Sequence, residues 1–380
     1  MNRSRFSFFT TILLIIMLVF GGCGGVDEDS VWDGEADTSW YNASNNSFTI
    51  SKAAQLAGMA KLLIDGTTFS GKTITLTNNI DLAGIEWTPI GFFPDGYSFL
   101  GVFNGGGHTI SNMTIEDEGT IKGLSYVGLF GYINSVATVK NINLTNVHIN
   151  VSSSSFACAG SIAGGNEGTI SNCTSNGNVI TSVPADLSVT SVIAGGAVGY
   201  NTGAVSNCAF NGGVSATVTG AGGGGDISLY GAASAGGIVG ANTGKISNCT
   251  SNGSVSTSGH NGGSAGGIVG ASEGNVSNCE SNGSVSASSY YKRTEAGGIA
   301  GANGGAVTNC NKPTGSVKVV IVSNESTQTR SQYEGGIIGY LEYSSPHVIS
   351  GNTYNKTATG QQWGIGYDDR ITPPGPSDDV

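Results

Sequence analysis

Hydrophobic residues along most of this chain come in groups of two to four, separated by Gly, Asn and Ser. Such spacing is typical of many short strands joined by turns. From Lys72 onward apolar and polar residues alternate, as at Ile74 and Leu76 and again at Ile80 and Leu82. The pattern therefore predicts an all-β protein.

Residues 51–66 depart from this pattern and predict a helix. Four apolar residues fall at i, i+3, i+4 and i+7 and form one face: Leu56, Met59, Ala60 and Leu63. Ser51 is positioned to cap the start of the helix, and Gly66 to end it. We expect a helix over 52–65 that covers one open end of the sheets, because the terminal units of a repeat protein are atypical.

One unit is repeated along the chain at intervals of about 30 residues. It reads AGGIVGANTGKISNCTSNGSV at 235–255 and AGGIVGASEGNVSNCESNGSV at 265–285, and further copies begin at Ala159, Ala194 and Ala296. We interpret GGIVG, KISNC and SVS as its strands. A unit of this size cannot bury its apolar side alone, so successive copies must stack, each strand pairing with its counterpart in the next copy. The repeat predicts a parallel β-helix.

Stacking the copies aligns a column of asparagines: Asn112, Asn141, Asn172, Asn207, Asn248, Asn278 and Asn309. Asparagine tolerates the left-handed backbone of a bend, and its amide can bond the same amide one coil away. A cysteine follows each of the last five of these asparagines: Cys173, Cys208, Cys249, Cys279 and Cys310. We expect Ile238, Ile246 and Cys249 to face the core. A buried reduced ladder and disulfides both remain open for the cysteines. We expect no metal site, because there is no CxxC and no local His.

The units G-G-I-V-G-x-N-x-G-x-I-S-N-C-x-x-x-G-x-V resemble the GLUG motif, a glycine-rich repeat of bacterial surface proteins. The resemblance covers about residues 99–355 and implies a right-handed parallel β-helix, adhesin-like and at the cell surface. Such repeats also occur beside the catalytic part of bacterial IgA-cleaving metallopeptidases. The resemblance carries no catalytic residue with it.

Residues 1–22 predict a lipoprotein signal peptide. Arg3 and Arg5 precede an apolar run over 12–20 that is too short for a lasting membrane span. Phe20-Gly21-Gly22-Cys23 then resembles a bacterial lipobox, in which the cysteine becomes the lipidated N-terminus. An ordinary secretory signal is the alternative. We expect lipidation at Cys23 and anchoring at the outer membrane or cell surface.

The predicted organisation has five parts. They are a signal peptide (1–22), a lipidated tether (23–40), an N-terminal cap region with the helix (41–98), a GLUG-repeat β-helix (99–355), and a C-terminal cap with a disordered tail (356–380).

Composition and charge exclude some functions. The formal net charge is −11 and no Lys/Arg stripe is present, which argues against nucleic acid and leaves the N-terminal lipid as the membrane contact. The chain has neither H-E-x-x-H nor G-x-S-x-G, and acids in the repeats stand singly, as at Glu167, Glu273, Glu280 and Glu295. We therefore expect a protein that is not an enzyme and needs no cofactor.

Insertions between the copies are the predicted binding elements, since they emerge on one side of a solenoid. Residues 286–295 bring together four side chains suited to contact a sugar or protein: Tyr290, Tyr291, Lys292 and Arg293. A chance exposed loop is the alternative. The sequence favours adhesion to a host or matrix protein or glycan. A β-helical carbohydrate-active enzyme and a structural spacer or assembly component are the other hypotheses.

Overall fold

The computed structural model describes residues 31–92, 97–117, 126–153, 156–184, 191–219, 233–259, 262–289, 294–321, 332–341, 348–368 and 375–378. Residues Trp32–Val380 form one compact unit. The fold described below is that of this unit.

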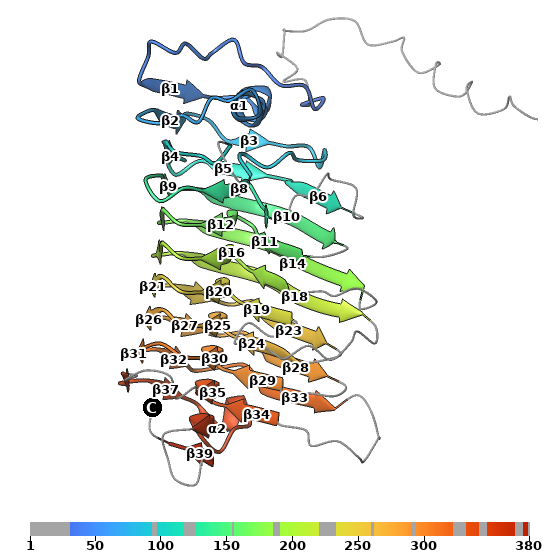
Figure 1. Ribbon diagram of the computed structural model, residues 1–380, viewed down its shortest axis with the longest axis vertical. Helices are drawn as coiled ribbons and strands as arrows, with labels where there is room; N and C mark the ends of the chain where they lie inside the picture. Colours follow the sequence, from blue (N-terminus) through green and yellow to red (C-terminus); the bar gives the residue numbers. More distant parts are fainter. Residues whose placement is uncertain are drawn as a thin grey trace, which may run out of the picture. The chain divides into compact units, whose positions relative to one another are not determined.

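Each repeat makes one coil that passes through four sheets (Figure 1). Successive coils pair in parallel and in register, as at Ala235 with Ala265 and Ile246 with Val276. The fold is a parallel β-solenoid with a helix at its N-terminal end, as the sequence predicts. One coil contains β19 (Ala233–Gly236), β20 (Val239–Asn242), β21 (Lys245–Ser247), β22 (Thr250–Ser251) and β23 (Ser254–Gly259).

The seven-stranded sheet and the nine-stranded sheet hold the first two strands of each coil. The seven-stranded sheet contains β7 (Tyr126–Val127), β11 (Phe156–Gly160), β15 (Ser191–Gly195), β19, β24 (Gly263–Gly266), β29 (Thr294–Gly297) and β34 (Gln332–Gly335). The nine-stranded sheet contains β8 (Phe130–Ile133), β12 (Ala163–Asn166), β16 (Val198–Asn201), β20, β25 (Val269–Ser272), β30 (Ala300–Asn303), β35 (Ile338–Leu341), β38 (Ile365–Asp368) and β39 (Gly375–Ser377).

The ten-stranded sheet and the thirteen-stranded sheet complete each coil. The ten-stranded sheet contains β1 (Ser47–Ile50), β2 (Thr73–Leu76), β4 (Val102–Asn104), β9 (Thr138–Lys140), β13 (Thr169–Ser171), β17 (Ala204–Ser206), β21, β26 (Asn275–Ser277), β31 (Val307–Thr308) and β36 (Ile349–Ser350). The thirteen-stranded sheet contains β3 (Ile80–Asp81), β5 (Thr109–Ser111), β6 (Thr114–Asp117), β10 (Asn143–Ser152), β14 (Thr174–Pro184), β18 (Ala209–Thr219), β22, β23, β27 (Glu280–Ser281), β28 (Val285–Ser289), β32 (Asn311–Lys312), β33 (Val317–Ile321) and β37 (Thr353–Tyr354).

The segment GGIVG is not the single strand that the sequence predicts. The chain turns at Gly237 and Ile238, so that β19 and β20 lie in different sheets. A Cβ atom on Gly236 would lie 1.8 Å from the carbonyl oxygen of Val239. The glycine therefore permits a turn so tight that the two strands separate.

The core is built from the positions predicted for it. Ile238, Ile246 and Cys249 are buried against the apolar residues of neighbouring coils. Asn248 lies at a corner between β21 and β22 with a φ of 54°, as the left-handed tolerance of asparagine predicts. The repeated positions thus serve packing and backbone geometry.

The N-terminal end carries the predicted helix, α1 (Ala53–Ile64). Its buried face contains the four predicted residues Leu56, Met59, Ala60 and Leu63. Ser51 does not cap the helix. Lys52 occupies the N-cap position, and the Ser51 backbone N–H donates to Gln55 Oε1 at 2.9 Å.

Part of the predicted tether belongs to the folded unit. Trp32 and Trp40 are partly buried against the core, and Trp40 contacts Phe48 with ring centroids 5.4 Å apart. These aromatic rings supply enough apolar area to hold the segment on the cap, so a tether that extends to residue 40 is too long.

The C-terminal cap includes part of the predicted disordered tail. After α2 (Lys356–Thr359), β38 pairs with β35 in parallel, and β39 pairs with β38 antiparallel. Ile365 is buried in the core, and Tyr354 Oη donates to Asp378 Oδ1 at 3.1 Å. These contacts order the residues that the structure describes here.

Candidate binding groove

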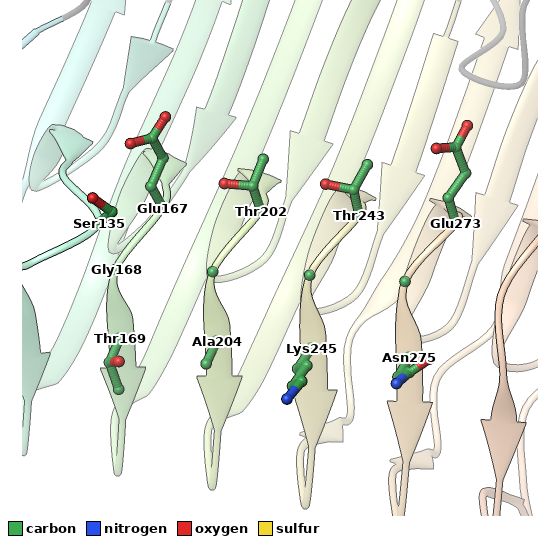
Figure 2. A pocket seen from close by; sticks show the side chains of 13 residues that line it. Ser135, Glu167, Gly168, Thr169, Thr202, Ala204, Thr243, Lys245, Glu273 and Asn275 are labelled. Atoms are coloured by element: carbon green, nitrogen blue, oxygen red, sulfur yellow. The ribbon is translucent and has the colours of Figure 1, made fainter.

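A polar groove with a volume of about 550 Å³ crosses successive coils where the nine-stranded sheet turns into the ten-stranded sheet (Figure 2). One wall carries one outward side chain per coil: Glu167, Thr202, Thr243 and Glu273, with Ser135 at the N-terminal end. The other wall carries Thr169, Ala204, Lys245 and Asn275. The groove is open to solvent along the direction in which the coils stack.

The local sequence positions the first wall. Each of its four coils contains a polar residue, a variable residue and a glycine, as in Asn166-Glu167-Gly168 and Asn242-Thr243-Gly244. The polar residue is buried, and the variable residue points outward and lines the groove (Figure 2). The backbone N–H of Thr243 donates to the carbonyl of Asn201 on the preceding coil at 2.8 Å, which fixes the height of its side chain.

A ladder of buried amides lies beneath the groove. Asn166 Nδ2 donates to Asn201 Oδ1 at 2.7 Å, Asn201 Nδ2 donates to Asn242 Oδ1 at 2.8 Å, and Asn242 Nδ2 donates to Ser272 Oγ at 3.1 Å. These bonds satisfy polar groups that water does not reach and hold the coils in register.

The predicted asparagine column makes fewer amide bonds than expected. Asn172 Nδ2 donates to Asn141 Oδ1 at 3.3 Å, and no such bond continues from Asn207 to Asn309 among the described residues. The continuous ladder belongs instead to the asparagines under the groove, whose side chains point inward. The exposed column keeps its backbone role, with φ of 52–58° at each of its seven members.

Charge in the groove is concentrated at three side chains. Glu167 is half-buried and accepts a hydrogen bond from Tyr132 Oη at 2.8 Å. Burial, followed by this bond, raises the pKa of the Tyr132 hydroxyl, so it stays a donor. Glu273 and Lys245 are exposed.

The two carboxylates are too far apart to act as a hydrolytic pair. Glu167 and Glu273 are three coils apart, a separation of about 14 Å at about 4.8 Å per coil. Glycoside hydrolases place their two carboxyl groups about 5 to 9.5 Å apart. The groove is therefore suited to hydrogen-bond a ligand at several points along its length.

The repeat is also found in known proteins. The family model described as the GLUG motif matches residues 231–256, a segment that contains β19 to β22 and the first half of β23. The chain carries the GLUG motif. This confirms the resemblance seen in the repeat, and it assigns one GLUG unit to one coil.

Two relatives match part of this chain. One is a protein of Evansella cellulosilytica whose name, a Gly-rich membrane protein, was assigned by inference. It is 30% identical over 165 residues, which cover 43% of this chain and 18% of the relative. Halomucin of Haloquadratum walsbyi is 28% identical over 155 residues, 39% of this chain and 2% of its own. The chain thus spans less than a fifth of either relative.

A crystal structure from Bacteroides ovatus, assigned by inference as an immunoglobulin A1 protease, has a similar fold. The TM-score is 0.53 with 23% sequence identity, and the match covers 82% of this chain and 85% of that chain. At this identity the likeness concerns the fold alone.

The cysteines of the GLUG copies form a buried column of free thiols. Each Sγ donates to a backbone carbonyl two residues before it, as Cys249 does to Ser247 at 3.2 Å. Hydrogen bonding between neighbouring thiols is the largest cause that raises the pKa of Cys208 and Cys249 to about 12. Of the two arrangements left open by the sequence, the structure has the reduced ladder.

None of the site residues predicted from the sequence lies in the part of the chain that the structure describes. Tyr290, Tyr291, Lys292 and Arg293 lie outside the described residues, as does Cys23. Glu280 accepts from Asn282 Nδ2 at 2.9 Å, and the buried Glu295 accepts from Ser264 Oγ at 2.5 Å. Across the described ranges, no three His, Cys, Asp or Glu side chains gather at a point suited to a metal. No helix in them is long and apolar enough to cross a membrane.

Sequence reasoning missed the groove, although the repeat contains a signal for it. In the aligned copies of the tripeptide in the first wall, the first residue is Asn or Ser and the third is always Gly. The middle residue varies and is Glu167, Thr202, Thr243 or Glu273. The first and third residues repeat because packing and backbone geometry restrict them. A middle residue that varies is not restricted in this way, which indicates that its side chain faces outward.

Proposed function

We propose that this protein is a surface-exposed, lipid-anchored scaffold that binds a ligand without catalysing a reaction on it. The observation that carries the proposal is the groove, where a rigid stack of coils displays polar side chains one coil apart. The wide spacing of Glu167 and Glu273 supports a non-catalytic role over a carbohydrate-active enzyme. The names of the two relatives, a membrane protein and a halomucin, support a place at the cell surface.

Binding and turnover separate this proposal from its enzymatic rival. The purified full-length chain is applied to a glycan and matrix-protein array and, in parallel, incubated with a polysaccharide panel while chain length is followed. We expect binding with no change in chain length. Cleavage of any polysaccharide in the panel would contradict the proposal.

The lipid anchor is tested on its own. Replacing Cys23 by Ala is expected to abolish palmitate labelling and to release the protein from membranes. A Cys158→Ala variant is the matched control, since Cys158 is buried in the fold. Labelling that persists in Cys23→Ala would show that the lipobox is misassigned.

The loop between two copies is a second place for ligand contact under this proposal. Tyr290→Ala combined with Tyr291→Ala is expected to weaken array binding, because paired tyrosines next to Lys292 and Arg293 are typical of contact hot spots. Array binding that is unchanged by the double substitution would assign ligand contact to another part of the chain.

A further inference from the structure

The shape of the groove points to a polymer. Its lining comes from four consecutive coils, with Ser135 contributed by the coil before them. It runs along the stacking direction and is open along its length (Figure 2). A compact ligand would be held in one place by an enclosing pocket that buries most of its surface. An open trough instead suits a segment of an extended chain that continues beyond both ends.

The distance between equivalent side chains of the groove indicates the length of one residue of that polymer. Glu167, Thr202, Thr243 and Glu273 occupy the same place in successive coils, which are about 4.8 Å apart. This rise is close to the length of one sugar residue in an extended β-1,4-linked glycan. Each coil would therefore meet one sugar residue, and opposite edges of successive sugars would face the groove, because neighbouring sugars of an extended β-1,4-linked strand are turned over relative to one another.

The chemistry of the walls suits hydroxyl groups. Threonine hydroxyls donate and accept, and carboxylates accept from neighbouring hydroxyls of a sugar ring. On the facing wall Lys245 and Asn275 supply donors. Two carboxylates against one ammonium, in a chain with net charge −11, disfavour a polyanionic strand.

The lining is also held in place before a ligand arrives. Tyr132 orients Glu167 through its hydrogen bond, and the buried amides of Asn201 and Asn242 fix the coils that carry Thr202 and Thr243. Side chains ordered in advance lose less entropy on binding. This matters for a ligand held by many weak polar contacts.

We infer that the groove binds a neutral, extended β-1,4-linked polysaccharide strand that lies parallel to the stack of coils, with one sugar residue per coil. The inference rests on the proposed function, since it names the ligand class of a non-catalytic binding protein. The aromatic-cationic loop at 290–293 is not required for it.

The test is calorimetric titration of the full-length chain with β-1,4-linked oligosaccharides of increasing length. Cellohexaose, mannohexaose and xylohexaose are the probes, each with its disaccharide and tetrasaccharide. At least one series should bind, with affinity rising about 10-fold or more from disaccharide to tetrasaccharide and little beyond five sugars. The β-1,4-linked hexaglucuronate should not bind, and affinity should change little with added salt, because the strand carries no charge.

A double substitution locates the binding. Thr202→Val with Thr243→Val keeps the side-chain volume and removes two hydroxyls, which should weaken binding about 10- to 30-fold. Thr217→Val is the matched control on the half-exposed face of β18 in the thirteen-stranded sheet, and it should change nothing.

The outcomes separate the inference from the function it rests on. If the double substitution leaves hexasaccharide binding unchanged, the groove is not the binding site, but the proposed function still holds. The same conclusion follows if the protein binds a matrix protein and none of the hexasaccharides. A preference for the hexaglucuronate, or for a cationic peptide with steep salt dependence, overturns the neutral ligand class. A chain that binds nothing on the array overturns both proposals.

Discussion

At the scale of the residue, the backbone conformation at the bends of the solenoid could be predicted from the sequence. The hydrogen-bond partners of individual side chains could not. The positive φ of Asn248 follows from the chemistry of asparagine and the need for a bend. Which amides bond across coils depends on whether a side chain points inward. Asn201 and Asn242 point inward and Asn248 is exposed, a difference set by the stacking of the sheets.

Asn248 offers a test of the backbone argument. Asn248→Ala is expected to lower the free energy of unfolding by about 1 kcal/mol, because a Cβ without a local hydrogen-bonding group disfavours the left-handed region. Asn248→Gly should change it by a few tenths at most, since glycine adopts this conformation freely. Urea unfolding of both variants measures the difference. Equal destabilisation by Ala and Gly would mean that contacts of the asparagine side chain, and not the positive φ, determine the contribution of Asn248 to stability.

Lys312 is a residue that the repeat pattern does not explain. It replaces the serine of the preceding coil, Ser281, and is fully buried. Its Nζ donates to Ser281 Oγ at 3.2 Å and to the carbonyl of Gly283. Burial lowers the pKa of Lys312 from its ordinary 10.5 to about 8. The folded state therefore holds this proton less well than the unfolded chain does.

This difference predicts that stability rises with pH. Below pH 8 both states are protonated and the folded state bears the full cost of the buried charge. Between about pH 8 and 10.5 the unfolded chain binds more protons, so the free energy of unfolding increases, by about 3 kcal/mol in all.

Lys312→Met isolates this contribution from the other groups that titrate in the same window. The difference in unfolding free energy between variant and wild type, measured by urea unfolding from pH 7 to 10.5, should favour Met at pH 7 and shrink as pH rises. The exposed Lys318→Met is the control and should follow wild type. A difference that stays constant with pH would refute a deprotonating buried lysine.

At the scale of the element, a strong local pattern predicted structure better than a weak one. The helix α1 was found from its four apolar residues, because its 3.6-residue period is unlike the rest of the chain. GGIVG was misread as one strand, because a glycine-rich apolar run looks the same whether straight or sharply bent. The groove was missed for a related reason, since its residues sit in a turn whose outward side is defined only by the stacked coils.

The cap function of α1 can be tested at two positions of the helix. Leu56→Ala is expected to cost about 2–5 kcal/mol of unfolding free energy, since Leu56 is fully buried over the first coils. Ile64→Ala, at a position 48% exposed, should cost less than about 1 kcal/mol. Thermal and urea unfolding measure both. Equal costs at the two positions would argue that the helix does not cover the core.

At the scale of the whole molecule, the repeated sequence predicted the stack of coils. The structure of the two ends could not be predicted in this way, because the ends do not repeat. The tether was predicted to run to residue 40 and the C-terminal tail to be disordered, because the repeat pattern covers neither, yet Trp32 and Trp40 pack on the cap and β39 pairs with β38. Their packing depends on an end surface made by distant segments. Between the ends each coil contacts its neighbours, so stability should be close to a sum over coils.

That sum predicts that one coil can be removed without loss of the fold. Deleting residues 235–264 joins Ser234 to Ala265, and the register of the sheets is kept because Ala235 and Ala265 are paired positions. Circular dichroism and protease resistance should remain those of a folded solenoid with a lower unfolding midpoint. Deleting 235–249 instead joins Ser234 to Thr250, which belongs to another sheet, and this shorter deletion should prevent folding.

The same in-phase deletion connects the architecture to the groove. It removes Thr243 and Lys245 together, so the coil of Thr202 would be followed directly by that of Glu273. If one sugar residue lies on each coil, the oligosaccharide length at which affinity stops rising should fall by one sugar, while neutral β-1,4-linked strands still bind. A folded deletion variant whose length dependence is unchanged would mean that the ligand does not follow the coils. The coil spacing would then have no part in recognition, even though it holds the fold together.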